Sequence, residues 1–155
     1  MNATASPSRA APGHRIHVPC LSCGAVNRLP VARRREGPRC AKCGHPLLDG
    51  GVFALDDERF DAFAGRLDLP LLVQFWAPWS AAGKSALPEL AAVASQLHGE
   101  VLVARISANA GLKLMSRWNI TAVPTLLWFD HGREVKRTTQ MLAAAQMVRW
   151  LGSRE

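Results

Sequence analysis

Apolar and polar positions follow two alternating patterns along residues 52–152. Short runs of apolar residues predict strands at 52–55, 71–76 (LLVQFW), 101–107 (VLVARIS) and 125–130 (TLLWFD). Apolar residues spaced three and four positions apart predict helices at 56–67, about 80–98, 111–118 and 142–152. Residues 133–138 come directly after His131-Gly132 and predict the return strand of an antiparallel hairpin. This alternation, which ends in a hairpin, indicates an α/β fold in which helices cover both faces of a mixed sheet.

The 155 residues divide by composition into three parts. Residues 1–15 are rich in Ser, Pro and Ala and predict a flexible arm, residues 16–50 hold every cysteine, and residues 51–155 hold the predicted α/β domain. The chain has no run of about 18 apolar residues, and its N-terminus lacks the apolar segment of a secretory signal. We therefore expect no membrane span and a cytoplasmic protein, in a compartment where thiols stay reduced.

The four cysteines form two knuckles, 20-CLSCG-24 and 40-CAKCG-44, in a C-x2-C-x16-C-x2-C pattern. The two-residue gap lets both sulfurs of a pair reach one ion, and the glycine after each pair allows the backbone to turn tightly behind it. The pattern predicts a small zinc ribbon with a tetrahedral zinc site, whose ligands are Cys20, Cys23, Cys40 and Cys43. Two disulfides and a redox-active C-x-x-C are the alternatives. The expected compartment disfavours the disulfides, and the absence of a strand-to-helix context disfavours the redox motif.

The formal net charge of +7 is concentrated in the first third of the chain. Residues 1–52 carry eight Lys and Arg against two acids, whereas residues 53–155 carry eleven against ten. Arg33-Arg34-Arg35 is therefore a candidate nucleic-acid site. No aromatic residue lies among these arginines to stack on bases, so a solvated loop between the knuckles is the favoured interpretation.

Three segments of the α/β domain resemble the thioredoxin family. They are FWAPW at 75–79, Lys84 with Pro88 four residues later, and ITAVPT at 120–125, ahead of a predicted strand. With the two knuckles before that domain, the chain from about residue 16 to 152 resembles the zinc-ribbon class of bacterial thioredoxins. The resemblance implies a thioredoxin fold, a cis-proline at Pro124 that faces the loop after residue 76, a helix kinked at Pro88, and shielding of that loop by Trp76 and Trp79.

The same resemblance shows where this chain departs from the family. Members carry Trp-Cys-Gly-Pro-Cys-Lys at the strand-to-helix turn, and this chain has WSAAGK at 79–84. The attacking cysteine falls on Ser80 and the resolving cysteine on Gly83. The family's buried aspartate falls on Gln74, and a glycine of its substrate-contact loop falls on Gln140. Because thiol–disulfide exchange needs a thiolate and a second thiol, we expect no catalytic residue at this loop and no protein-disulfide reductase activity from it.

The residues around the loop favour a binding role. Ser80 is expected to cap the following helix, and the family docks extended polypeptide beside its cis-proline. The sequence thus predicts a non-catalytic polypeptide-binding or chaperone-like module, whose binding face is formed by Trp79, Ala81, Ala82, Val123 and Pro124. Two alternatives stay open: thiol–disulfide oxidoreductase activity in cell redox homeostasis through the ribbon cysteines, and nucleic-acid binding through the basic ribbon.

Two further interpretations of the loop are weaker. Gly83-Lys84-Ser85 resembles the end of a phosphate-binding loop, but Pro78 stands where that motif needs its first glycine and has no N–H to offer a phosphate. A hydrolase with Ser80 as its nucleophile would need a general base, and the resemblance places neither His98 nor His131 near the loop.

Overall fold

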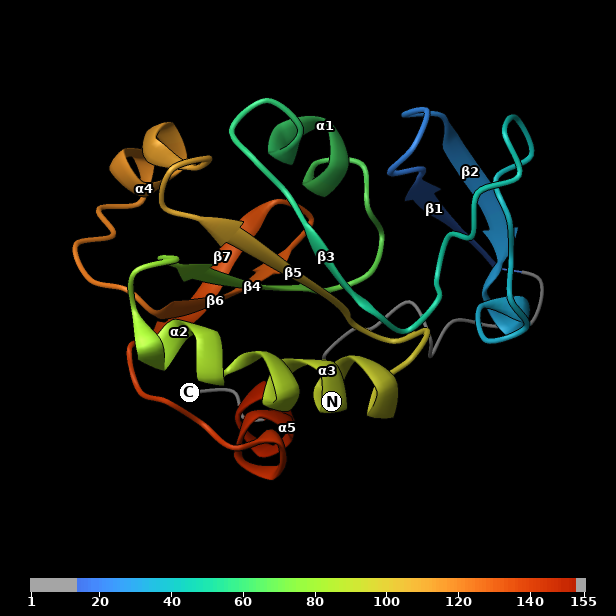
Figure 1. The fold of residues 1–155 in the computed structure, drawn as a ribbon. Coiled ribbons are helices and arrows are strands. Elements are labelled where there is room, and N and C mark those ends of the chain that lie inside the picture. The colour runs from blue at the N-terminus through green and yellow to red at the C-terminus, as the bar shows by residue number, and fades with distance from the viewer. Residues whose placement is uncertain (1–13, 153–155) are drawn as a thin grey trace.

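The computed structural model describes residues 14–152 and contains a five-stranded mixed sheet with a two-stranded hairpin beside it (Figure 1). The strand order of the sheet is β3-β5-β4-β6-β7. Its strands are β3 (Val52–Ala54), β4 (Leu71–Trp76), β5 (Leu102–Ser107), β6 (Thr125–Asp130) and β7 (Arg133–Thr138). β3, β5 and β4 run parallel, β6 runs antiparallel to β4, and β7 runs antiparallel to β6.

Helices cover both faces of this sheet (Figure 1). One face carries α1 (Phe60–Ala64) and α4 (Leu112–Arg117), and the other carries α2 (Ala81–Ser85), α3 (Leu87–Gln96) and α5 (Ala144–Gly152). Under α1 and α4 the core is aromatic, since the rings of Phe60, Trp118 and Phe129 pack with centroids 4.9–5.1 Å apart. Under α3 and α5 it is aliphatic and includes Leu72, Leu90, Val93, Met147 and Leu151. The arrangement confirms the predicted α/β fold.

The bounds of several predicted elements agree with the structure, and two helices differ. β4, β6 and β7 have the predicted bounds. The helix predicted at about 80–98 is two helices, α2 and α3, which meet at Ala86, and Pro88 lies in the first turn of α3, where its missing N–H leaves no bond unmade. The helix predicted at 56–67 is only the short α1. Asp56 Oδ1 accepts the N–H groups of Glu58 and Arg59, and this turn delays the helix.

The segment ahead of the sheet contains a hairpin that the sequence analysis did not predict. β1 (Arg15–Pro19) pairs antiparallel with β2 (Val26–Pro30), and the short 3-10 helix η2 (Val31–Arg33) follows. The hairpin begins at Arg15, inside the range predicted as a flexible arm. The rest of that arm, residues 1–13, lies outside the described residues.

The ribbon and the main domain share one hydrophobic core. Ile16 and Val18 of β1 are fully buried in the same cluster as Leu55, Phe63 and other side chains of the α1 face. Leu47 and Leu48, between the second knuckle and β3, are buried there as well. The ribbon is therefore part of the folded body rather than a separate unit on a linker.

Polar contacts also join the ribbon to the domain. The backbone N–H of His17 donates to the Asp68 carboxylate over 2.7 Å, and the other carboxylate oxygen lies 3.2 Å from Nε2 of His131 in the β6–β7 turn. On the other side, the imidazole of His98 bonds to the carbonyl of Leu48 over 2.6 Å.

Within residues 14–152, none of the helices combines the length and the apolar character that a membrane span requires.

Candidate functional site

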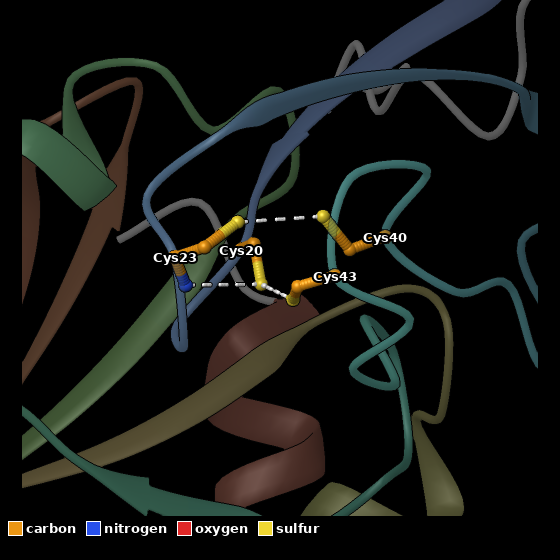
Figure 2. Close-up of side chains that lie close together, drawn as sticks. All are labelled: Cys20, Cys23, Cys40 and Cys43. Atoms are coloured by element: carbon orange, nitrogen blue, oxygen red, sulfur yellow. Dashed lines mark hydrogen bonds between the residues drawn. The ribbon is translucent and has the colours of Figure 1, made fainter.

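Four thiols from two separate turns meet at one point of the ribbon. Cys20 and Cys23 lie at the β1–β2 turn, and Cys40 and Cys43 lie in the loop that leads toward β3. Figure 2 shows the sulfurs facing one another in pairs that cross between the knuckles. Sγ of Cys20 lies 3.6 Å from Sγ of Cys43, and Sγ of Cys23 lies 3.6 Å from Sγ of Cys40. All four sulfurs lie within 4.8 Å of one another, and they are the only metal-ligating cluster among the described residues.

The backbone of the two knuckles brings the sulfurs together. In each knuckle the N–H of the closing glycine donates to the carbonyl of the first cysteine, over 3.0 Å at Gly24 and 2.8 Å at Gly44. Both glycines have φ of 81°, a left-handed conformation that other residues adopt at a cost. The turn also directs N–H groups at sulfur, because Ser22 N donates to Cys20 Sγ over 3.3 Å. A tetrahedral ion with metal–sulfur bonds of about 2.3 Å places its sulfurs about 3.8 Å apart, so this geometry fits a divalent metal.

The surroundings of the cluster set unequal thiol pKa values. The backbone N–H of Cys43, the side chain of Asn27 and the backbone N–H of Lys42 lower the pKa of Cys40 to about 6, so that this thiol ionises at neutral pH. The backbone of Ala25 lowers the pKa of Cys23, but burial and the hydrogen bonds with the other three thiols outweigh it and raise that pKa to about 11. A metal ion binds thiolates and would ionise the remaining thiols on binding. The side chain of His45, which directly follows the second knuckle, is exposed and outside the cluster.

The second candidate site is the loop that joins β4 to α2. Ser80 has an extended backbone, and its Oγ accepts the N–H of Gly83 over 3.4 Å, so it is the N-cap of α2 as predicted. Gly83 is buried and has no side chain to contribute. The loop contains no thiol, because all four cysteines lie in the ribbon. His98 and His131 bond to Leu48 and to Asp68 and Asp130, so neither imidazole supplies the general base that a Ser80 nucleophile would need.

A cis-proline lies beside this loop. The Val123–Pro124 peptide bond is cis, as the family resemblance implied. β6 pairs Thr125 with Phe75, which places Pro124 next to the end of β4. Pro124 also lines a small cavity of about 20 Å³ together with Gln74, Gln140 and Met141. The structure therefore brings the cis-proline, the residue at the position of the family's buried aspartate and the last loop together beneath the β4–α2 connection.

The apolar side chains around the loop are largely exposed. Trp79 is 70% exposed, Ala81 and Ala82 are exposed, and Val123 and Pro124 are half-buried. Met141, which sequence reasoning did not single out, extends this face with 47% exposure. In the described part of the chain, neither the backbone N–H nor the carbonyl of Val123 has a hydrogen-bond partner. This set is named the Trp79 face below.

One functional side chain beneath the loop was missed by sequence reasoning. Arg105 of β5 lies directly opposite Gln74 of β4 in the sheet register. Its Nε donates to Gln74 Oε1 over 3.0 Å, its Nη2 donates to the carbonyl of Gly83 over 2.7 Å, and its guanidinium lies 3.9 Å from the centre of the Trp76 ring. Burial lowers the pKa of this arginine. A lone cation within the apolar run VLVARIS is a signal for such a contact, but the register that selects Gln74 is not visible in the sequence.

The arginine triplet is largely engaged within the protein. Arg34 donates to the carbonyl of Val31 over 2.8 Å, and Arg35 donates to the carbonyl of His98 over 3.1 Å and pairs with Glu100. Arg33 lies 3.9 Å from the Glu36 carboxylate. Arg34 and Arg35 thus hold the loop after β2 in place through bonds to backbone carbonyls.

Comparisons with known proteins agree with this geometry. Residues 51–153 match the family model described as thioredoxin, and residues 19–45 match the zinc-ribbon model described as thioredoxin 2, N-terminal. Thioredoxin C-3 of Corynebacterium nephridii is 33% identical over 132 residues, which cover 85% of this chain and 90% of that protein. Protein disulfide-isomerase A5 of Mus musculus is 32% identical over 110 residues, which cover 68% of this chain and 21% of that protein. Thioredoxin of Haemophilus influenzae is 25% identical over 100 residues, which cover 64% and 94% of the two chains.

Proposed function

The chain belongs to the thioredoxin family, and from that premise we propose that it binds polypeptide without exchanging disulfides. The observation that carries the proposal is the loop at the family's reactive position, which has lost its thiols but keeps its exposed apolar surroundings. Family relatives are thioredoxins and protein disulfide isomerases, whose chemistry depends on a cysteine pair. Ser80 and Gly83 stand at those positions here.

The chemistry of the two residues explains why exchange is not expected. A thiolate attacks a disulfide because a thiol ionises near neutral pH, whereas a serine hydroxyl does not. Ser80 Oγ is also engaged as the cap of α2. Gly83 has no group that could release a mixed disulfide. Gln74 in place of a buried carboxylate fits the same interpretation, because without a thiol to serve, a buried charge is only a desolvation cost.

The Trp79 face supports binding of an extended, apolar segment. Trp79 projects a large aromatic surface into solvent, and Val123 offers a backbone N–H and a carbonyl that lack partners in the described structure. An extended chain laid beside Pro124 could pair with that backbone and bury the tryptophan. Such a complex would form and dissociate without a covalent step, as suits a chaperone or an assembly subunit.

We assign a structural role to the ribbon and propose zinc as its metal, in the cytoplasm. Four thiolates fill a tetrahedral site and leave no open position for a substrate or a water. The ribbon also lies at the end of the sheet opposite the β4–α2 loop in Figure 1, so it does not border the Trp79 face.

A binding assay with matched variants tests the proposal. The probe is a fluorescently labelled, permanently unfolded polypeptide that contains no cysteine, so that covalent capture cannot contribute. We expect Trp79→Ala to raise the Kd at least about tenfold, because central aromatic residues dominate such contacts. Leu112→Ala is the control, since Leu112 is 67% exposed but lies on α4, on the other face of the sheet. Failure of the wild-type protein to bind, or equal weakening by both variants, would refute the role of the Trp79 face.

A second assay tests the loss of redox chemistry. NADPH-coupled disulfide reduction with excess thioredoxin reductase should show no turnover for the wild-type protein. The Ser80→Cys/Gly83→Cys double variant should turn over, because the strand and the helix that flank the two positions are in place. Turnover by the wild-type protein would move the reactive thiols to the ribbon and establish the oxidoreductase alternative.

A further inference from the structure

We propose that Arg105 is a positioning residue, which holds residues 77–83 and the Trp79 side chain in one conformation. The inference deepens the proposed function, since it concerns how the Trp79 face is presented, and its binding readout rests on that function. The structural readout, which is the order of the Trp79 side chain, does not depend on the proposed function. No motif indicates this role, because Arg105 lies on β5, outside the loop that it contacts.

One guanidinium contacts the elements on both sides of the loop, the end of β4 and the first turn of α2. At the start of the loop, the Trp76 ring lies 3.9 Å from Cζ of Arg105. Beyond the loop, within α2, the carbonyl of Gly83 accepts from Nη2 over 2.7 Å. The six residues between these contacts, 77–82, include the exposed Trp79 and the cap Ser80. A single side chain therefore spans the base of the segment and fixes the distance between its two ends.

Gln74 fixes the orientation of the guanidinium itself. Arg105 Nε donates to Gln74 Oε1 over 3.0 Å, and Gln74 is only 4% exposed. Among the described residues, Arg105 forms no ion pair with a carboxylate. Its hydrogen bonds thus go to a neutral amide and to a loop carbonyl. A planar fork can make both contacts and stack on an indole at once, whereas a lysine ammonium cannot.

The expected consequence is a binding face formed before a partner arrives. A loop ordered in advance loses less conformational entropy on binding than a mobile one. If Arg105 were replaced, Trp79 would keep its exposure and chemistry but would sample more orientations. Affinity for polypeptide would then fall although no contact residue had changed.

The test compares Arg105→Met with a control arginine that also makes two side-chain hydrogen bonds and lies beside a tryptophan ring, although its bonds go to a carboxylate. Arg117 donates twice to Asp61, over 2.8 and 3.1 Å, and lies 5.2 Å from the Trp118 ring on the other face of the sheet. The primary readout is NMR relaxation of the Trp79 indole N–H. Arg105→Met should lower its order parameter and raise the Kd for the unfolded, cysteine-free polypeptide about three- to tenfold. Arg117→Met should change neither quantity.

A second substitution keeps the proposal falsifiable if Arg105→Met fails to fold. Arg105→Lys retains the charge and the aliphatic stem but not the fork, so it should also loosen Trp79, to a smaller extent. Unchanged Trp79 order in a folded Arg105 variant would overturn the inference. Lower Trp79 order together with a wild-type protein that binds no polypeptide would retain the positioning role and refute the proposed function instead.

Discussion

The ribbon and the β4–α2 loop differ in which groups hold their local structure together. The ribbon retains all four of its thiols, which lie within 4.8 Å of one another. The loop has none, yet it keeps the strand, the helix cap, the cis-proline and the exposed Trp79 around it. In the ribbon the four thiols meet between the two knuckles, where a bound metal would join them. In the loop, backbone bonds and an arginine maintain the structure and require no thiol.

Under the proposed function, this difference explains how the loop can lack thiols and remain folded. The hydrogen bonds of Ser80 and Arg105 hold the loop without any thiol. A ribbon cysteine contributes directly to folding, since a segment of this size buries too little apolar surface to be stable alone. The comparison therefore predicts that stability depends steeply on the ribbon thiols and only weakly on the residues of the loop.

The largest effect is expected from Cys40→Ser. Cys40 is buried, and its replacement removes one of four ligands. Apparent metal-binding energies at such sites are about 10–16 kcal/mol, so loss of the metal should unfold the ribbon. We expect atomic emission to find one zinc per wild-type chain and none in the variant, and limited proteolysis to cleave residues 16–50. His45→Ala is the control and should retain the metal. A Cys40→Ser variant that keeps one zinc per chain would contradict the expectation that the ribbon depends on each of its four thiols.

The second effect tests whether the ribbon and the domain unfold together. Ile16→Ala removes a fully buried side chain of β1 from the shared core and should lower the free energy of unfolding by about 2–5 kcal/mol. Val26→Ala, at a position of β2 that is 36% exposed, should lower the free energy of unfolding far less. Urea denaturation followed by circular dichroism should show one transition for both variants. Two separate transitions would mean that the ribbon folds independently.

The sequence predicted those features that depend on local pattern. Apolar runs predicted the bounds of β4 and β6, and the His131-Gly132 turn predicted β7. The C-x2-C spacing predicted the four-cysteine cluster, and the family resemblance implied the cis bond at Pro124. Contacts set by strand register were not predictable. Arg105 meets Gln74 across 31 positions, and His17 meets Asp68 across 51. The β1–β2 hairpin was missed because its strands are short and one of them, Val26–Pro30, is mostly polar or exposed.

The third effect concerns Asp68 at the junction of ribbon and domain. Burial alone would raise the pKa of Asp68, but hydrogen bonds from the His17 backbone and imidazole, with the charges of His17 and His131, lower it below its usual value. The folded state therefore holds the proton less tightly than the unfolded chain. The ionised carboxylate stabilises the protein above a pH of about 4, and this contribution is lost as the pH falls.

Asp68→Asn should accordingly lower the free energy of unfolding by about 1–2 kcal/mol at pH 7, and by much less near pH 3. The measurement is the urea midpoint of the wild-type and variant proteins across that pH range. Asp130→Asn is the control, because its carboxylate is 52% exposed and, among the described residues, its one side-chain hydrogen bond is to the adjacent His131. If the difference in urea midpoint between the wild-type protein and Asp68→Asn stayed unchanged down to pH 3, this role of the carboxylate would be contradicted.

The smallest effect is expected at Ser80, the position of the family's attacking cysteine. Ser80→Ala removes the N-cap of α2, and cap removal costs about 0.5–2 kcal/mol. The bond to Gly83 N is long, at 3.4 Å, so the loss should fall at the lower end of that range. Ser85→Ala is the matched control: its hydroxyl donates to the carbonyl of Ala82 within the same helix and caps no free N–H. Urea denaturation should show that the free energy of unfolding of Ser85→Ala lies within about 0.5 kcal/mol of the wild-type value. If Ser80→Ala instead lowered the free energy of unfolding by more than about 2 kcal/mol, capping alone would not account for the loss. The stability of the loop would then depend on one side chain, as the stability of the ribbon is expected to depend on each thiol.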